Sequence, residues 1–369
     1  MIVGIPKEIK TNENRVSITP DGVFELTQSG HSVLVEKNAG QGSGFTDREY
    51  EESGAKIIES RGNVWRLSEM IVKVKEPIEE EYQHFRKDLL LFTYLHLAAN
   101  KPLAEELMKK RVTGLAYETI QLENGSLPLL APMSEIAGKV GAQEAASLLA
   151  KHRGGKGVLI GGAAGVAPAK VVILGGGVSG QAAAEISLGL GAQVTILDLN
   201  INRLRFLSTF FGNRCITAYS NQKNIETAVA EADIVIGCIL IPGAEASHLV
   251  TRQMLSLLEP GSVVVDIAID QGGCFETSRP TTHEAPTYVT DDIVHYCVAN
   301  IPGAMPRTST IALSNATLPY IMKLAREDVE KLIRTNRDFN TCVNTHKGHL
   351  TYAAVGNALS IEANPISLN

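Results

Sequence analysis

The chain has 369 residues, of which 44% are hydrophobic and 20% charged, and its formal net charge is −6. This length is sufficient for two domains with cores of their own. The negative charge argues against a general nucleic-acid or anionic-membrane surface, and no apolar run approaches the ~18 residues of a membrane helix. A charged N-terminus without a signal-peptide pattern, and five scattered cysteines without Cys-x-x-Cys spacing, predict a cytoplasmic protein without a metal site.

The first ~130 residues alternate between strand-like and helix-like segments. Strands are predicted at residues 2–5, 32–36, 70–75, 89–96 and 112–117, and helices at 21–29 and 101–110. This part of the chain has no phosphate-binding fingerprint. It predicts an α/β domain that binds something other than the nucleotide.

The most specific motif lies near the middle of the chain. Four apolar residues at 171–174 lead into Gly175-Gly-Gly177-Val-Ser-Gly180, which is followed by a helical segment and a second strand that ends at Asp198. This order of strand, Gly-x-Gly-x-x-Gly, helix, strand and acid is the dinucleotide-binding fingerprint. A carboxylate at position 198 favours NAD over NADP because it accepts hydrogen bonds from ribose hydroxyls and repels a 2′-phosphate. Arg203 and Arg205 lie nearby and weaken that preference.

Further strands at 215–219, 233–240, 262–270 and 293–299 continue the alternation. Near-continuous apolar runs predict strands buried on both faces of a sheet. We therefore predict an α/β fold of two doubly wound, Rossmann-like domains with a cleft between them. The nucleotide domain spans 131–304, and the substrate domain combines 1–130 with 305–369, reached through a long helix at 312–335.

Four polar residues outside the fingerprint stand at the ends of apolar segments. Arg15 can hold a substrate carboxylate with its fork of donors, or be an ordinary surface arginine. Lys75, on the same side of its strand as Lys73, can pair with a carboxylate or be a strand-end charge. His96 can exchange a proton near neutral pH or be structural, and Asp270 can face the cofactor or cap a glycine turn. Together they suit an amino-acid or keto-acid oxidoreductase.

Several longer blocks carry a resemblance to a known family. They are Gly4–Glu8, Asn12–Val16 with Thr19-Pro20, Met70–Pro77, Leu91–Ala98, Pro132–Gly138, the fingerprint itself, Val265–Gly273 and Val298–Ala304. In this order they resemble the alanine dehydrogenase / nicotinamide nucleotide transhydrogenase family along nearly the whole chain. The resemblance implies reversible NAD-dependent oxidation of L-alanine to pyruvate and ammonium, and a homohexamer. It implies no nucleic-acid or membrane partner.

The resemblance also implies roles for individual residues. Arg15 and Lys75 would bind the substrate, His96 and Asp270 would be the catalytic acid/base groups, and Met133 and Asn300 would border the pocket. Cofactor contacts are implied for Ser134, Gly175, Gly177, Val178, Ser179, Gly180, Asp198, Arg203, Ser220, Ile239, Leu240, Ile267, Ala268, Ile269, Asp270, Arg279, Val298, Ala299, Asn300 and Ile301.

Some features depart from the family pattern, and other functions remain open. Arg203 replaces a lysine that is common in the family, and Ala164 stands where a proline is expected. A transhydrogenase α-subunit shares the fold, but normally continues into membrane segments. A saccharopine-type dehydrogenase would need room for a long charged substrate. A catalytically silent NAD sensor would keep the glycines and Asp198 without needing the four polar groups.

Overall fold

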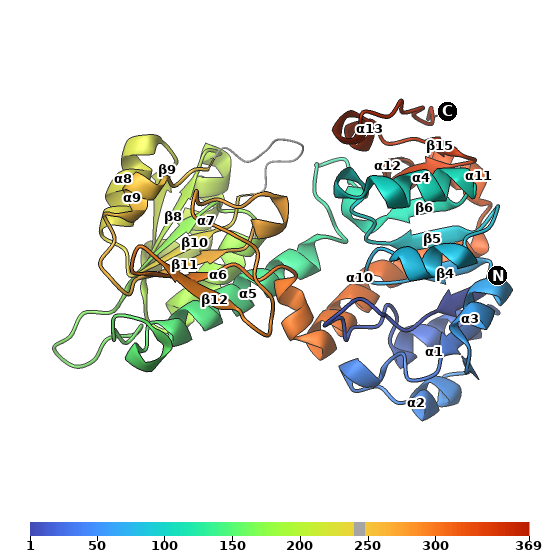
Figure 1. Ribbon diagram of the computed structural model, residues 1–369, viewed down its shortest axis with the longest axis horizontal. Helices are drawn as coiled ribbons and strands as arrows, with labels where there is room; N and C mark the ends of the chain where they lie inside the picture. Colours follow the sequence, from blue (N-terminus) through green and yellow to red (C-terminus); the bar gives the residue numbers. More distant parts are fainter. Residues whose placement is uncertain (240–247, 369) are drawn as a thin grey trace. The chain divides into compact units, whose positions relative to one another are not determined.

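The computed structural model describes residues 1–239 and 248–368. The chain forms two compact units (Figure 1). The first unit comprises Met1–Met133 and Met305–Asn369, and the second comprises Ser134–Ala304. Leu240, one of the residues for which a cofactor contact is predicted, lies outside the described residues.

The first unit is built on a sheet that has eight strands among the described residues, in the order β15-β14-β6-β5-β4-β1-β2-β3. The strands are β1 (Ile2–Ile5), β2 (Ser32–Glu36), β3 (Lys56–Ile58), β4 (Met70–Val72), β5 (Leu90–Thr93), β6 (Thr113–Ala116), β14 (Val343–His346) and β15 (His349–Leu350). Strands β1 to β6 pair in parallel, whereas β14 runs antiparallel to β6 and to β15. Every residue of β4 and β6 is buried, so the centre of this sheet is covered on both faces.

Most helices of the first unit begin at a Thr, Asn or Asp whose side chain accepts a backbone N–H of the first turn. The helices of this unit are α1 (Pro20–Gln28), α2 (Asp47–Glu52), α3 (Arg61–Leu67), α4 (Lys101–Lys109), α10 (Pro306–Arg326), α11 (Val329–Thr335), α12 (Arg337–Cys342) and α13 (Ala353–Leu359). The single helix predicted at 312–335 is wrong in two respects, because the helix begins at Pro306 and is interrupted between α10 and α11. Glu327 is extended there, and the Asp328 carboxylate accepts the backbone N–H of Lys331 at 2.8 Å and so starts a new helix.

The second unit has a sheet of seven strands among the described residues, in the order β12-β13-β11-β10-β7-β8-β9. The strands are β7 (Lys170–Leu174), β8 (Gln193–Asp198), β9 (Cys215–Tyr219), β10 (Ile234–Gly237), β11 (Val263–Asp266), β12 (Thr287–Thr290) and β13 (Ile293–Tyr296). Numbered from β7, the parallel strands follow the 3-2-1-4-5-6 order of a Rossmann sheet, with β12 as an antiparallel edge. The strand order reverses between β7 and β10, which is where such sheets bind nucleotides.

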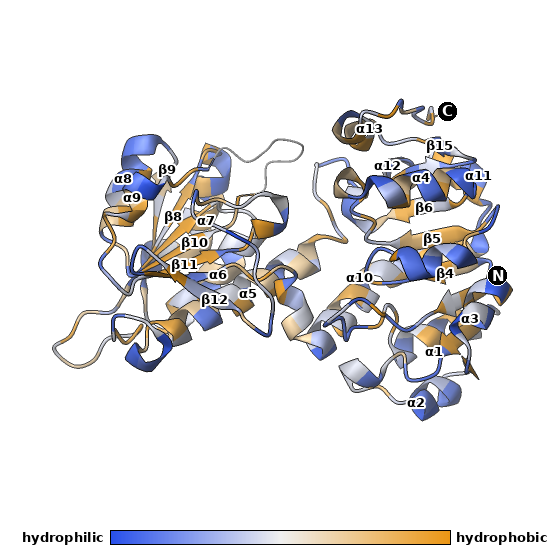
Figure 2. Ribbon diagram, viewed as in Figure 1, coloured by the Kyte–Doolittle hydropathy of each residue, from blue (hydrophilic) through white to orange (hydrophobic). Residues whose placement is uncertain are grey.

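The helices of the second unit are α5 (Ala131–Leu148), which begins in the first unit, α6 (Val178–Gly189), α7 (Ile201–Phe211), α8 (Gln222–Ala230) and α9 (Arg252–Leu255). Figure 2 shows the separation of polarity that this architecture requires: the strands are mostly apolar, whereas α2 and α8 are strongly polar. No helix among the described residues is both long enough and apolar enough to cross a membrane.

Several strands are shorter than predicted. The segments 233–240 and 293–299 remain in strand only to Gly237 and Tyr296. Three further strands are shorter for one common physical reason. The segments 70–75, 89–96 and 262–270 remain in strand only to Val72, Thr93 and Asp266. Beyond these points, side-chain carboxylates accept backbone N–H groups: Glu8 for residues 74 and 75, Glu118 for 95 and 96, and Asp266 for 268. These hydrogen bonds divert the backbone from the sheet just before or at the predicted site residues Lys75, His96 and Asp270.

Candidate active site

The glycine loop between β7 and α6 has the geometry that its sequence predicts. Gly175 has a φ of +96°, which only glycine adopts readily. A Cβ added at Gly180 would lie 1.8 Å from the carbonyl oxygen of Gly175, so α6 can approach the strand only with glycine there. A Cβ at Gly177 would meet no atom of the described chain within 4 Å. That open side of the loop leaves room for a ligand at the N-terminus of a twelve-residue helix.

Asp198 connects the end of β8 to this loop. One of its carboxylate oxygens accepts the backbone N–H of Gly176 at 2.7 Å, and the other accepts that of Asn200, also at 2.7 Å. Arg203 donates to the carbonyl oxygen of Gly176 and, at 2.7 Å, to the side chain of Gln181. A carboxylate has about four acceptor sites, so Asp198 can hold the loop and still accept ribose hydroxyls.

Most of the predicted cofactor residues follow the carboxyl ends of parallel strands, which share one edge of a sheet. Ser220 follows β9 and donates its backbone N–H to the carbonyl of Asp198 at 3.0 Å, and Ile239 follows β10. Residues 267–270 follow β11, and 298–301 follow β13. Two residues have other positions: Ser134 is on α5, and the guanidinium of Arg279 stacks 4.2 Å from the ring centroid of Tyr288 on β12.

Asp270 is exposed in a short 3-10 turn, Ile269–Gln271, and the loop that carries it is held by Asp266. The fully buried Asp266 carboxylate accepts the backbone N–H of Ala268 at 3.1 Å, that of Cys274 at 2.8 Å and the hydroxyl of Ser278 at 2.5 Å. Burial raises the pKa of Asp266, although these hydrogen bonds oppose the rise. The buried carboxylate therefore joins both ends of the turn that presents Asp270.

Asn300 has a φ of +64°, in the left-handed region that asparagine tolerates better than most residues. Its carbonyl oxygen lies 3.1 Å from Nε2 of His283. The 3-10 turn Ile301–Ala304 begins immediately after it. The turn fixes the backbone of predicted cofactor residues beyond β13.

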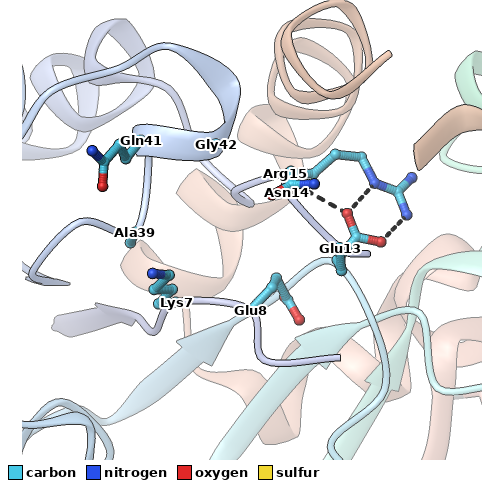
Figure 3. A pocket seen from close by; sticks show the side chains of 8 residues that line it. All are labelled: Lys7, Glu8, Glu13, Asn14, Arg15, Ala39, Gln41 and Gly42. Atoms are coloured by element: carbon cyan, nitrogen blue, oxygen red, sulfur yellow. Dashed lines mark hydrogen bonds and ion pairs between the residues drawn. The ribbon is translucent and has the colours of Figure 1, made fainter. Parts of the chain in front are cut away.

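In the first unit, Arg15 is buried and paired with Glu13. Its Nε and Nη2 donate to the two carboxylate oxygens of Glu13 at 2.7 and 2.5 Å, a bidentate pair that Figure 3 shows. Nη1 lies 3.2 Å from Sδ of Met133. Burial acts to lower the pKa of Arg15, but the pairing with Glu13 outweighs it and raises the pKa, so the guanidinium is fixed in both charge and orientation.

The two lysines predicted on one strand have different environments. Lys73 is fully buried, with its ammonium 3.1 Å from Glu8 and 2.8 Å from Glu81. Lys75 is half-buried, and its backbone N–H donates to the Glu8 carboxylate at 3.4 Å. Lys73 is thus a structural cation. Lys75 lies two residues further along the chain, directly after the segment that Lys73 anchors.

His96 is exposed and follows β5 on a turn, with its ring stacked on Tyr94 at 5.8 Å between centroids. Glu76 is close enough to interact with it electrostatically. Burial acts to raise the pKa of Glu76, but His96, Lys10 and Lys75 together outweigh burial and hold that pKa below its ordinary value. The Glu76 carboxylate therefore interacts electrostatically with Lys10, Lys75 and His96.

A cavity of about 270 Å³ opens beside the Glu13–Arg15 pair (Figure 3). It lies within the first unit, and its lining residues are Lys7, Glu8, Glu13, Asn14, Arg15, Ala39, Gln41 and Gly42. Among the described residues, no group of three or more His, Cys, Asp or Glu side chains could hold a metal ion.

Sequence reasoning missed the carboxylates that organise these positions, namely Glu8, Glu13, Glu118 and Asp266. Only Glu13 carries a local signal, since it lies two residues before Arg15. The others meet their partners through the pairing of distant segments, and a carboxylate in a sequence is by default taken as exposed.

A Rossmann sheet with an open glycine loop, joined in one chain to a second α/β unit that contains buried cations, is typical of nicotinamide-nucleotide-dependent dehydrogenases. Comparison with known proteins narrows this class. The model of the N-terminal domain of alanine dehydrogenase/PNT matches residues 4–137, and that of the C-terminal domain matches 141–353. The chain belongs to the alanine dehydrogenase/PNT family.

Individual relatives agree with this assignment. The chain is 54% identical to an alanine dehydrogenase of Staphylococcus haemolyticus, over 98% of this chain and 97% of the relative. A solved L-alanine dehydrogenase superposes with a TM-score of 0.94 at 50% identity, covering 98% of this chain and 99% of the other. A transhydrogenase from Sinorhizobium meliloti has a TM-score of 0.81 at 24% identity, covering 96% of this chain and all of the other, and shows a shared fold.

Proposed function

We propose that the protein catalyses the reversible NAD-dependent oxidative deamination of L-alanine: L-alanine, NAD⁺ and water give pyruvate, ammonium, NADH and a proton. The observation that carries the proposal is the 54% identity to an alanine dehydrogenase, which extends over both units. The geometry agrees with it, since the second unit has an open nucleotide loop and the first has cations suited to a carboxylate substrate.

The proposed substrate residues follow from the chemistry of alanine. Arg15, held through Nε and Nη2 by Glu13, and Lys75 bind the carboxylate or carbonyl oxygen. Met133 and Asn300 are proposed to border the substrate pocket. Oriented cations both neutralise the substrate carboxylate and fix its Cα for reaction.

NAD⁺, when bound, supplies the acceptor for the hydride of the alanine Cα. The residues present fit such a group: Gly177 leaves one side of the loop open, and Asp198 stands where ribose hydroxyls are read. The other residues for which the family resemblance implies a cofactor contact are proposed to bind NAD⁺ as well. We propose that Asp198 selects NAD over NADP.

Proton transfer is assigned to His96 and Asp270. His96 takes a proton from the water that adds to the imine carbon and later returns one to the departing ammonia. Asp270 is the second acid/base group. Both side chains are exposed and can therefore reach a substrate.

We also propose that the protein is cytoplasmic and a homohexamer. Exposed apolar side chains in the segment that follows α5, where Leu159 is 68% and Val166 is 64% exposed, favour self-association, and the number of six subunits rests on the family resemblance. Light scattering of the purified protein tests the assembly, and a monomeric mass would remove this part of the proposal.

Absorbance of NADH tests the reaction in both directions, with L-alanine and NAD⁺ and then with pyruvate, ammonium and NADH. We expect turnover both ways, little activity with NADP⁺, and at least a ~100-fold lower kcat in His96→Ala. NAD binding without turnover of alanine would contradict the proposal and favour a sensor or a transhydrogenase-like role. Near wild-type turnover in His96→Ala would remove His96 as the proton carrier.

A further inference from the structure

The backbone of His96 is held by a carboxylate from a neighbouring strand. Glu118 lies in the 3-10 turn Tyr117–Thr119 that follows β6. One of its oxygens accepts the N–H of His96 at 2.7 Å and that of Leu95 at 3.1 Å, and the other lies 3.2 Å from the same Leu95 nitrogen. Because β5 and β6 pair in parallel up to Thr93 and Ala116, their carboxyl ends lie side by side and Glu118 reaches across.

This contact occurs where the backbone is in an unusual conformation. His96 has a φ of +47° and a ψ of 36°, the left-handed region that few residues other than glycine adopt. This conformation lies three residues after the end of β5 and starts the turn Leu97–Ala99, in which the carbonyl of His96 accepts the N–H of Ala99 at 3.2 Å. Such a conformation persists only where the surroundings enforce it.

Other charged groups act on the same region. Tyr94 stacks on the imidazole, and Glu76, which pairs with Lys10, interacts with it electrostatically. The elements packed on the turn add little: α13 has no ionisable side chain, and on α4 Lys101 and Glu105 pair with each other at 4.0 Å. Glu118 is therefore the carboxylate that contacts the His96 backbone directly.

We propose that Glu118 is a positioning residue for His96. Its carboxylate holds the left-handed turn that presents the imidazole. The assignment rests on the proposed function of His96 as a proton carrier. Glu118 touches only backbone N–H groups and takes no proton itself.

The test is Glu118→Gln, with Glu123→Gln as the matched control, because Glu123 is an exposed carboxylate in the loop that follows. The readouts are kcat and the KM values for alanine and NAD⁺. In Glu118→Gln we expect kcat to fall about tenfold with the KM for NAD⁺ unchanged, because the ring is less well aimed. Glu123→Gln should match the wild type.

Kinetic constants of Glu118→Gln identical to those of the wild type would overturn the proposal. If Glu118→Gln does not fold, Glu118→Asp takes its place: the carboxylate is kept, but its shorter reach should lower kcat. An unchanged kcat in Glu118→Asp would equally refute the assignment. The NMR chemical shifts of the His96 ring, identified by their absence in His96→Asn, should differ between Glu118→Gln and the wild type, which makes the same comparison without turnover. It thereby separates failure of this inference from failure of the proposed function.

Discussion

The buried cation Lys73 offers a sharp test of how the first unit is held together. Its side chain is fully buried between Glu8 and Glu81, whose side chains are 2% and 1% exposed. Burial acts to lower the pKa of Lys73, but the two carboxylates outweigh it and raise the pKa, so the group is a buried ammonium. Burial raises the pKa of Glu8, although Lys73 opposes the rise. With both carboxylates ionised, the three side chains together carry one net negative charge.

Replacing Lys73 by methionine keeps the volume but leaves two carboxylates buried without their cation. Breaking a buried ion pair from one side costs ~3–5 kcal/mol, and we expect a loss of that size in Lys73→Met. The matched control is Lys109→Met, which removes a lysine that is 72% exposed and paired with Glu106. An exposed pair of this kind contributes ~0–1 kcal/mol.

A second substitution distinguishes charge from packing. Glu81→Gln added to Lys73→Met restores the net charge of the cluster, so the double variant should be more stable than Lys73→Met by ~1–3 kcal/mol. If instead the two losses add, the carboxylates do not repel each other in the way proposed. Glu8 is left in place because its carboxylate also accepts the backbone N–H of Val74 at 2.6 Å.

The chain carries its own probe for this measurement. Trp65 is the single tryptophan of the sequence, lies fully buried on α3 in the first unit, and stacks 5.9 Å from His84 at the end of the turn Glu79–His84 that contains Glu81. Its fluorescence during urea denaturation therefore reports the unfolding of this unit. A loss below ~1 kcal/mol in Lys73→Met would refute the reasoning.

The sign of the pH dependence follows from the raised pKa of Lys73. A group whose pKa is higher in the folded state stabilises fully below its unfolded value of 10.5 and loses that contribution as the pH rises through the folded value. The difference between wild type and Lys73→Met should therefore stay constant from about pH 7 to pH 10.

The remaining predictions concern the second unit. Gly177→Ala should leave the unfolding midpoint unchanged, as no atom of the described chain lies within 4 Å of the added Cβ, while NAD affinity measured by calorimetry falls at least ~10-fold. Gly180→Ala, whose Cβ would meet the carbonyl of Gly175, should lower both the unfolding midpoint and the NAD affinity. An equal change of the unfolding midpoint in the two glycine variants would contradict this account. Asp266→Ala frees both ends of the loop that carries Asp270 and should lower kcat more than ~10-fold; unchanged kinetics would mean that the loop holds itself. Asp198→Gly should reduce the ratio of kcat/KM for NAD⁺ over NADP⁺ by ~10-fold or more, and an unchanged ratio would remove its role as selector.

Much of the second unit could be predicted from the sequence because its signals are local. The turn at Gly175, the close packing at Gly180 and the acid at the end of β8 all lie within 24 residues, and each geometry depends on which residue occupies one position. Runs of buried apolar residues likewise identified most strands. The sequence signal failed where a strand ends, since apolar character continues past Asp266 and Thr93 although the strands do not.

The ends of those strands depend on contacts that have no local signature. Glu8 meets the N–H of Val74 66 positions away along the chain, and Glu118 meets that of His96 22 positions away. Neither carboxylate differs in the sequence from the many exposed acids around it. The partner is determined only by the order of strands in the sheet, which places the ends of β1, β4, β5 and β6 next to one another.

The presence of these carboxylates is explained by the chemistry proposed for the site. A site for a small carboxylate substrate needs cations, and a cation withdrawn from water needs a nearby anion to stay charged and oriented. The Glu13–Arg15 pair satisfies this demand through the Nε and Nη2 edge of the guanidinium, and Glu8 satisfies it for Lys73 while it binds the backbone of Lys75. The acids next to the predicted substrate residues therefore hold either the cation itself, as Glu13 holds Arg15, or the backbone that carries it, as Glu8 holds Lys75. Removing either acid should disturb substrate binding.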